Sequence, residues 1–256
     1  MYANYHTHTV RCLHASGTER EYVERACANG LKILGFSDHA PYLFPADYYS
    51  GMRMRPHETA SYCETIEALR AEFSDRIQLH IGFEMEYYPK YFDDTIRFLH
   101  DYPIEYLILG QHFLFNEIDR VYSGAATEDE SVLAQYVTQC ETALRTEKFT
   151  YFAHPDLIRY TGNDAVYGRY ITRLIRTAKE LDVPLELNIL GLSTKRAYPN
   201  ERFWQLVAEA DAPCIIGCDA HHTEDVAKPE DVRAAYDYLA RFGLTPLKQI
   251  TFHSPF

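Results

Sequence analysis

The 256-residue chain has no run of 18 apolar residues, so it carries no segment typical of a transmembrane helix. Positive charge is scarce, because 25 lysines and arginines stand against 37 aspartates and glutamates, which gives a formal charge of −12. Such acidity disfavours general binding to nucleic acid or to an anionic membrane. It still allows a local basic pocket for an anionic small-molecule substrate.

Disulfide patterns and export signals are also missing. The six cysteines form no CxxC pair and no dense framework, which is typical of a reduced, cytoplasmic protein. The first residues lack a basic stretch followed by an apolar core, so we expect them to be mature sequence rather than a signal peptide.

Low-complexity tracts, Gly/Ser linkers and repeats of 20–50 residues are absent as well. Hydrophobic residues make up 46% of the chain and charged residues 24%, which excludes a disordered or fibrous protein. Since nothing divides the chain, we expect residues 1–256 to form a single domain.

Short apolar runs alternate with longer amphipathic stretches. The runs, strand-like in length, lie at about 2–6, 32–37, 77–83, 105–111, 149–153, 184–190, 214–218 and 248–252. The helix-like stretches lie at about 19–29, 57–74, 90–101, 130–146, 165–181, 200–210 and 229–241. This alternation predicts βαβ units and a parallel sheet, and seven or eight units favour a closed barrel. An open, doubly wound sheet is the alternative, but it usually has a glycine-rich turn after its first strand, and residues 6–8 contain no glycine.

Polar side chains able to bind metal follow almost every predicted strand. They are His6, His8, Asp38, His39, Glu84, His112, His154, Asp219 and His221. In a parallel barrel the carboxyl ends of the strands meet on one face, where active sites form. We therefore expect a metal site on that face.

The spacing supports this expectation. His6 and His8 are two residues apart on an extended segment, so their side chains point the same way, and Asp219 and His221 repeat this spacing. Imidazoles combined with a carboxylate are typical ligands of zinc, manganese or iron. His14 lies in the loop after His8 and can fold back. These candidates exceed what one ion takes, which predicts two or three divalent ions, with Glu84 bridging two of them.

The remaining polar residues at the strand ends have simpler interpretations. Asp38 and His39 are adjacent and must point to opposite sides of a strand, so we expect His39 to be the ligand and Asp38 to be an orienting residue behind the ligands or a proton donor. Glu86 is expected to lie behind the ligands or to be exposed. Five other histidines are expected to be caps or packing residues: His57, His80, His100, His222 and His253.

Several short motifs of the sequence resemble those of a known protein superfamily. Residues 6–15 (HTHTVRCLHA) resemble the opening motif of the PHP (polymerase and histidinol phosphatase) superfamily. Later motifs of that superfamily are matched in order by 37–41 (SDHAP), 82–87 (GFEMEY), 110–113 (GQHF), 153–156 (AHPD) and 217–221 (GCDAH). Within the superfamily, residues 14–17, 51–54 and 188–199 are most similar to the monofunctional histidinol-phosphatases.

The resemblance implies an α/β fold, a distorted (β/α)7 TIM-like barrel with its metal site at the carboxyl ends of the strands. The run 248–252 would then be an extra edge strand. The resemblance also implies three metal ions. The first would be bound by His6, His8, Glu84 and Asp219, and the second by Glu84, His112 and His154. The third would be bound by His14, His39 and His221. Arg159 and Arg196 match positions that bind the substrate phosphate.

The implied activity is metal-dependent hydrolysis of L-histidinol phosphate to L-histidinol and phosphate, in histidine biosynthesis. Glu84 and the two arginines would act in catalysis, and Asp38 could protonate the leaving alkoxide. Alternatives are another PHP phosphoesterase acting on a small monoester, a diester or a nucleotide; an amidohydrolase-like enzyme, for which a strand-end lysine is missing; and an inactive, metal-stabilised interaction domain. The sequence leaves the oligomeric state open.

Overall fold

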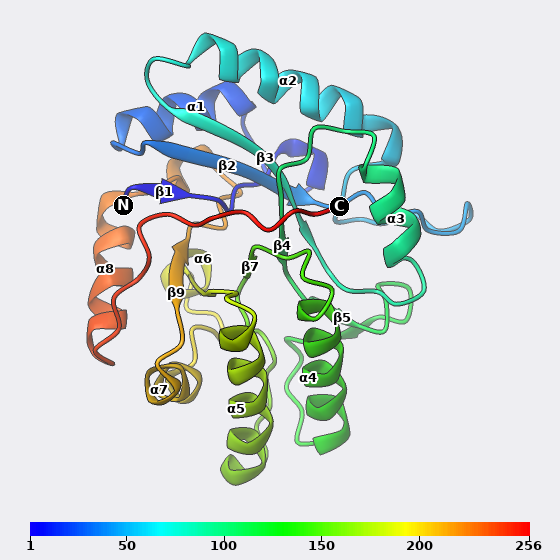
Figure 1. Cartoon of the computed structure of the whole chain (residues 1–256), viewed down its shortest axis with the longest axis vertical. Coiled ribbons are helices and arrows are strands. Elements are labelled where there is room, and N and C mark those ends of the chain that lie inside the picture. Colours follow the sequence, from blue (N-terminus) through cyan, green and yellow to red (C-terminus); the bar gives the residue numbers. More distant parts are fainter.

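A computed structural model describes residues 1–256 and arranges them around a seven-stranded parallel sheet curved into a barrel (Figure 1). The strands follow the order β1-β2-β3-β4-β7-β8-β9 around the barrel. Their bounds are β1 Ala3–Asn4, β2 Ile33–His39, β3 Gln78–Met85, β4 Tyr106–Leu109, β7 Tyr151–Phe152, β8 Leu185–Asn188 and β9 Cys214–Gly217. The two outer strands meet just past their ends, where Thr7 and Ala220 form a parallel bridge. The predicted seven-stranded barrel is thus confirmed, and the open doubly wound alternative is wrong.

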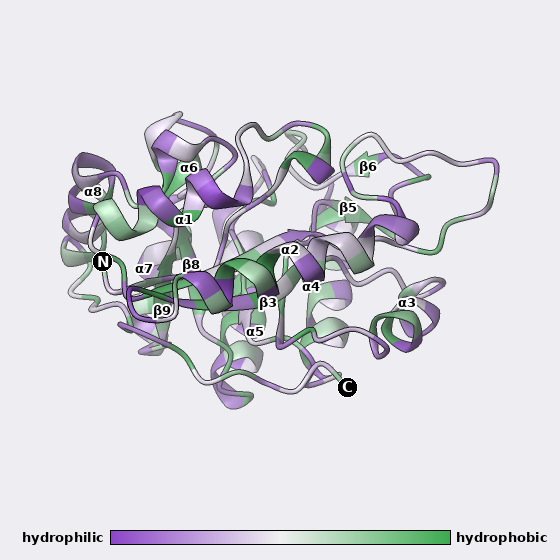
Figure 2. Ribbon diagram, turned by 90° about the horizontal axis from the view of Figure 1, so that it is seen from above, coloured by the Kyte–Doolittle hydropathy of each residue, from purple (hydrophilic) through white to green (hydrophobic).

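Helices surround the barrel (Figure 1). They are α1 Glu19–Ala28, α2 Thr59–Glu72, α3 Phe92–Leu99, α4 Glu130–Leu144, α5 Asp164–Glu180, α6 Ile189–Ser193, α7 Glu201–Ala210 and α8 Pro229–Ala240. Short 3-10 helices lie at Val10–Cys12, Pro56–Glu58 and Thr223–Asp225, and a hairpin of β5 Phe113–Leu114 and β6 Val121–Tyr122 projects after β4. Figure 2 shows polar and apolar residues alternating along α2 and α3, as expected of helices that cover a sheet with one face. No helix is both long and apolar enough to cross a membrane.

The amino-terminal half of the barrel interior is filled by large side chains. Tyr106 is fully buried there, and its hydroxyl donates to the carbonyls of Tyr5 (2.8 Å) and Phe36 (3.0 Å). A Cβ on Gly35 of β2 or Gly82 of β3 would come within 2.3 or 2.5 Å of the Tyr106 side chain, so both positions need glycine. Because this end is packed shut, polar side chains can gather only at the carboxyl end.

The run 248–252 is not a strand, which corrects the expectation of an extra edge strand. The segment instead crosses the amino-terminal end of the barrel (Figure 1), where Phe252 stacks on Tyr106 at 4.8 Å and meets Tyr5 edge-on at 5.6 Å. Ile250 packs against the same interior cluster. Its two apolar residues, Ile250 and Phe252, seal the barrel, and apolar residues at this two-residue spacing do not distinguish such a seal from a strand.

We predict that Phe252→Ala lowers the free energy of unfolding by about 2 kcal/mol, since a half-buried ring is lost from the barrel end. Phe256→Ala, at an exposed position of the same terminus, should change it by less than about 0.5 kcal/mol. Urea unfolding of both variants checks this. Equal effects would show that the segment does not seal the barrel.

Candidate metal centre

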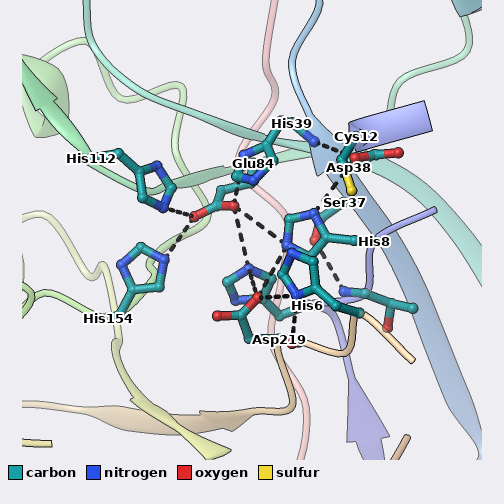
Figure 3. Close-up of polar contacts among 12 residues, drawn as sticks. His6, His8, Cys12, Ser37, Asp38, His39, Glu84, His112, His154 and Asp219 are labelled. Carbon is teal, nitrogen blue, oxygen red and sulfur yellow. Dashed lines mark hydrogen bonds and ion pairs between the residues drawn. The ribbon is translucent and has the colours of Figure 1, made fainter. Parts of the chain in front are cut away.

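Glu84, at the end of β3, lies at the middle of a cluster of histidines (Figure 3). Its Oε1 is 2.8 Å from His154 Nε2 and 3.5 Å from His112 Nε2. Its Oε2 is 3.5 Å from His6 Nε2 and 3.5 Å from His8 Nε2. The two oxygens of one carboxylate therefore face two separate groups of imidazoles, as a bridging ligand requires.

The first group has the dimensions of a tetrahedral metal site. Asp219 Oδ1 lies 3.5 Å from His6 Nε2 and 3.1 Å from His8 Nε2, and both nitrogens lie 3.5 Å from Glu84 Oε2. A metal bound at about 2.0–2.1 Å by four tetrahedral ligands spaces them about 3.4 Å apart. The four measured distances, 3.1–3.5 Å, are close to this spacing.

Two more groups adjoin the first. Glu84 with His112 and His154 forms the second, and His14, His39 and His221 form the third, in which the Nε2 atoms of His14 and His221 are 3.0 Å apart. His39 also lies 3.1 Å from Glu84 Oε2 through its Nδ1, so it is shared between the third group and the first. All nine predicted ligand side chains are thus brought together.

The closure of the barrel produces this convergence. His8 N–H donates to the Ala220 carbonyl (3.0 Å) and Ala220 N–H donates to the His6 carbonyl (3.3 Å), so the His6-x-His8 and Asp219-x-His221 pairs lie side by side. His154 and Asp219 have φ values of 32° and 53°, which non-glycine residues seldom adopt. Strained backbone at two ligand positions is typical of functional sites.

The electrostatics of the cluster require positive charge. Burial alone would raise the pKa of Glu84, but the positive charges of His112 and His6 hold it well below its usual range. His6 and His8 likewise hold the pKa of Asp219 well below its usual range, against the effect of its burial. Two ionised carboxylates deep in a barrel are stable only beside cations.

The histidines divide into two classes. Burial alone would lower the pKa of His8, but Asp219, Asp38 and Glu84 raise it to about 9. Burial, together with the charge of His8, lowers the pKa of His221 to about 3. His39 has its pKa lowered well below the usual range, mainly by burial. His39 and His221 are therefore neutral bases, the form in which imidazole binds metal.

Unpaired nitrogen atoms show that metal ions fit the cluster. His6 Nε2 and both ring nitrogens of His8 are buried without a hydrogen-bond partner. Such atoms are rare because leaving them unpaired costs about 1–3 kcal/mol each. Cys12 lies near His8 and His221, and burial raises the pKa of its thiol to about 12.

Several ligands are oriented from behind by carboxylates. His6 Nδ1 is 2.8 Å from Glu186 Oε2, and Asn188 Nδ2 donates to both Glu186 (2.7 Å) and Asp219 (3.1 Å). His112 Nδ1 is 3.0 Å from Glu86 Oε1, which confirms that Glu86 lies behind the ligands. Metal-binding histidines usually carry such a carboxylate on their second nitrogen.

Glu186 was missed by the sequence reasoning. Its only signal was the two-residue spacing to Asn188 on β8, which places both side chains on the interior face.

Gly110 is a second site residue that the sequence did not reveal. A Cβ there would come within 1.9 Å of Glu84 Oε1, so glycine leaves the space that the Glu84 carboxylate fills.

A pocket of about 770 Å³ opens above the ligands. Its wall includes Arg196, whose guanidinium donates to the Tyr198 hydroxyl (3.0 Å). Arg159 does not line this pocket; its side chain is exposed and has no hydrogen-bond or ion-pair partner. His222, expected to be a cap or packing residue, lines the pocket and is hydrogen-bonded to Ser16 (2.8 Å).

Asp38 lies behind the ligands and not in the pocket wall. It is buried, its Oδ1 is 3.5 Å from His8 Nδ1, and it accepts hydrogen bonds from the backbone N–H groups of Thr9 (3.2 Å) and His39 (2.8 Å). The Thr9 hydroxyl also donates to it. This position suits the orienting role rather than contact with a substrate.

Comparisons with known proteins agree with this arrangement. A family model described as PHP domain matches residues 4–189. A "Probable histidinol-phosphatase" of Deinococcus radiodurans is 28% identical over 230 residues, which cover 86% of each chain. A histidinol-phosphatase of Lactococcus lactis is 25% identical over 189 residues, which cover 72% of this chain and 65% of that protein.

The fold is also found among solved structures. A crystal structure of histidinol phosphate phosphatase from Lactococcus lactis, complexed with zinc, L-histidinol and phosphate, superposes with a TM-score of 0.70. The superposition covers 98% of both chains at 20% sequence identity. It shows that the two proteins share a fold.

We predict that Glu84→Gln removes at least one bound metal ion per chain, because an amide offers one oxygen where the carboxylate offers two. Elemental analysis after zinc loading and gel filtration measures the loss, and circular dichroism confirms the fold. Glu105→Gln is the control, since Glu105 pairs with His80 (2.9 Å) on strand segments away from the cluster. Glu84→Gln with the full wild-type metal content would place the centre elsewhere.

Proposed function

The chain belongs to the PHP domain family, and from that premise we propose that it is a metal-dependent phosphomonoesterase that converts L-histidinol phosphate into L-histidinol and phosphate. The observation that carries the proposal is that the metal-binding groups and Arg196 open onto one pocket. Divalent metals and a guanidinium are the two groups that bind a phosphate dianion most strongly.

We propose two or three divalent ions, zinc, iron or manganese, held by the three groups described above. When bound, these ions supply positive charge to the phosphate oxygens and activate the attacking water. Glu84 holds two of the ligand groups at a fixed separation. Asp38 keeps the His8 ring in place from behind, which accounts for its burial among hydrogen-bond donors.

Arg196 is proposed to orient the phosphate. A planar guanidinium presents paired N–H donors that match phosphate oxygens, and Tyr198 limits its motion. Arg159 is proposed as a second phosphate contact, as the family resemblance implies. Its guanidinium has no partner that would prevent it from turning toward the substrate.

The pocket also suits the organic part of the proposed substrate. Phe113, Tyr122 and Tyr198 line it and offer aromatic surfaces for an imidazole ring. Asp225 lines it too, and its carboxylate has no hydrogen-bond or ion-pair partner within the protein. An unpaired carboxylate in a pocket with metal ligands and an arginine favours a substrate with one anionic and one cationic end, as in an amino-alcohol phosphate.

The direct test is phosphate release by the metal-loaded protein from histidinol phosphate and from a panel of other monoesters, diesters and nucleotides. We expect kcat/KM for histidinol phosphate to exceed that of every panel member by roughly 100-fold, as a site with matched polar partners allows. A preferred diester or nucleotide would assign a different phosphoesterase activity. No release from any compound would overturn the proposal.

We further predict that Arg196→Ala and Arg159→Ala each lower kcat/KM by roughly 100-fold, the size of a lost charge-assisted contact of about 3 kcal/mol. Metal content and melting temperature should change little. Arg145→Ala is the control, since this exposed arginine is also unpaired and does not line this pocket. Steady-state kinetics within threefold of wild type for either variant would remove that arginine from the phosphate site.

A further inference from the structure

Arg53 is a fully buried arginine next to Met52, which lines the pocket above the metal-binding groups. Its side chain is 2% exposed, and it lies on the segment between β2 and α2. Nε donates to Glu117 Oε2 (2.7 Å), one terminal nitrogen donates to Glu86 Oε1 (3.0 Å), and the other donates to the Ala40 carbonyl (3.0 Å). A buried ion pair is costly to maintain, so three bonds from one guanidinium indicate a role beyond packing.

One of these bonds leads, through Glu86, to the candidate metal ligand His112. Glu86 Oε1, the atom that accepts from Arg53, is also 3.0 Å from His112 Nδ1. The other Glu86 oxygen, Oε2, is buried and has no partner. Arg53 and His112 therefore share one oxygen of Glu86, and Arg53 is the arginine or lysine that pairs with this carboxylate. A carboxylate that accepts from His112 Nδ1 favours, in the metal-bound state, the tautomer whose Nε2 is free to bind an ion beside Glu84, 3.5 Å away.

The other bond connects two walls of the pocket. Glu117 lies between β5 and β6, and Tyr48 O–H also donates to it (2.9 Å). Met52, the neighbour of Arg53, lines the pocket, and so do Phe113 and Tyr122 of the hairpin. The same guanidinium that binds Glu86 therefore also holds the 48–54 segment against the hairpin.

We infer that Arg53 is a positioning residue of the metal centre, which orients His112 through Glu86 and links that orientation to the pocket wall through Glu117. Arginine is needed because its planar fork reaches both carboxylates at once, whereas a lysine ammonium reaches one at a time. The inference rests on the metal centre of the proposed function and does not depend on which phosphoester is the substrate.

The test measures zinc affinity by competition with a chromophoric chelator, for wild type and for Arg53→Lys, Arg53→Met, Glu86→Gln and Glu117→Gln. We expect Arg53→Met and Glu86→Gln to weaken the binding of one zinc equivalent about 10- to 100-fold, the usual effect of losing a group behind a ligand. Arg53→Lys should be intermediate, a partial rescue that a merely structural role would not produce. Glu117→Gln should keep zinc affinity within threefold and raise KM with little change in kcat, because only the wall contact is weakened.

The control is Arg70→Met, which breaks the Arg70–Glu105 ion pair away from the pocket and should lower the melting temperature without changing zinc affinity. If Arg53→Met does not fold, the zinc affinities of Arg53→Lys and Glu86→Gln test the inference, since each variant keeps a side chain of similar size. Zinc affinity within threefold of wild type in both would overturn the inference. Wild-type protein that binds no zinc would instead contradict the proposed function.

Discussion

The candidate metal centre depends on the closure of the barrel between its first and last strands. Seven parallel strands form a ring only because Thr7 and Ala220 pair where the first and last strands end. That pairing brings His6 and His8 beside Asp219, so the four atoms around the first metal position come from three strands that are far apart in sequence. Since Tyr106 and Phe252 fill the opposite end of the barrel, the polar residues have one face on which to gather.

The carboxyl end of the barrel gathers buried negative charge that needs cations beside it. Glu84, Glu86, Glu186 and Asp219 are all buried at this end of the barrel. Arg53 offsets part of their charge, and the imidazoles provide the rest only as far as they are protonated. Bound divalent cations would satisfy the carboxylates and the unpaired imidazole nitrogens together, which links metal binding to the stability of the fold. The mostly acidic surface is no obstacle to an anionic substrate, because the attraction is local to the pocket.

Much of this could be predicted from the sequence, because strand ends in a parallel barrel converge and the ligands sit at strand ends. The opposite orientation of Asp38 and His39 followed from strand geometry alone. The segment 248–252 was misassigned, since the same apolar residues serve a strand or a barrel seal. Glu186 and Arg53 were not identified as site residues, because their contacts with His6 and Glu86 join segments far apart in the sequence, and the spacing of Glu186 and Asn188 shows only that both face the interior. Arg159 and Arg196 looked equivalent in sequence, and only the structure shows that Arg196 alone lines the pocket.

Anomalous X-ray diffraction from zinc-loaded crystals soaked with phosphate tests the central claim most directly. The account predicts a zinc peak within about 2.0–2.2 Å of His6 Nε2, His8 Nε2, Asp219 and Glu84, and a second peak on the other oxygen of Glu84 beside His112 and His154. Phosphate should bridge these ions with Arg196 in contact. Fully loaded crystals with no anomalous peak on either oxygen of Glu84 would contradict the account.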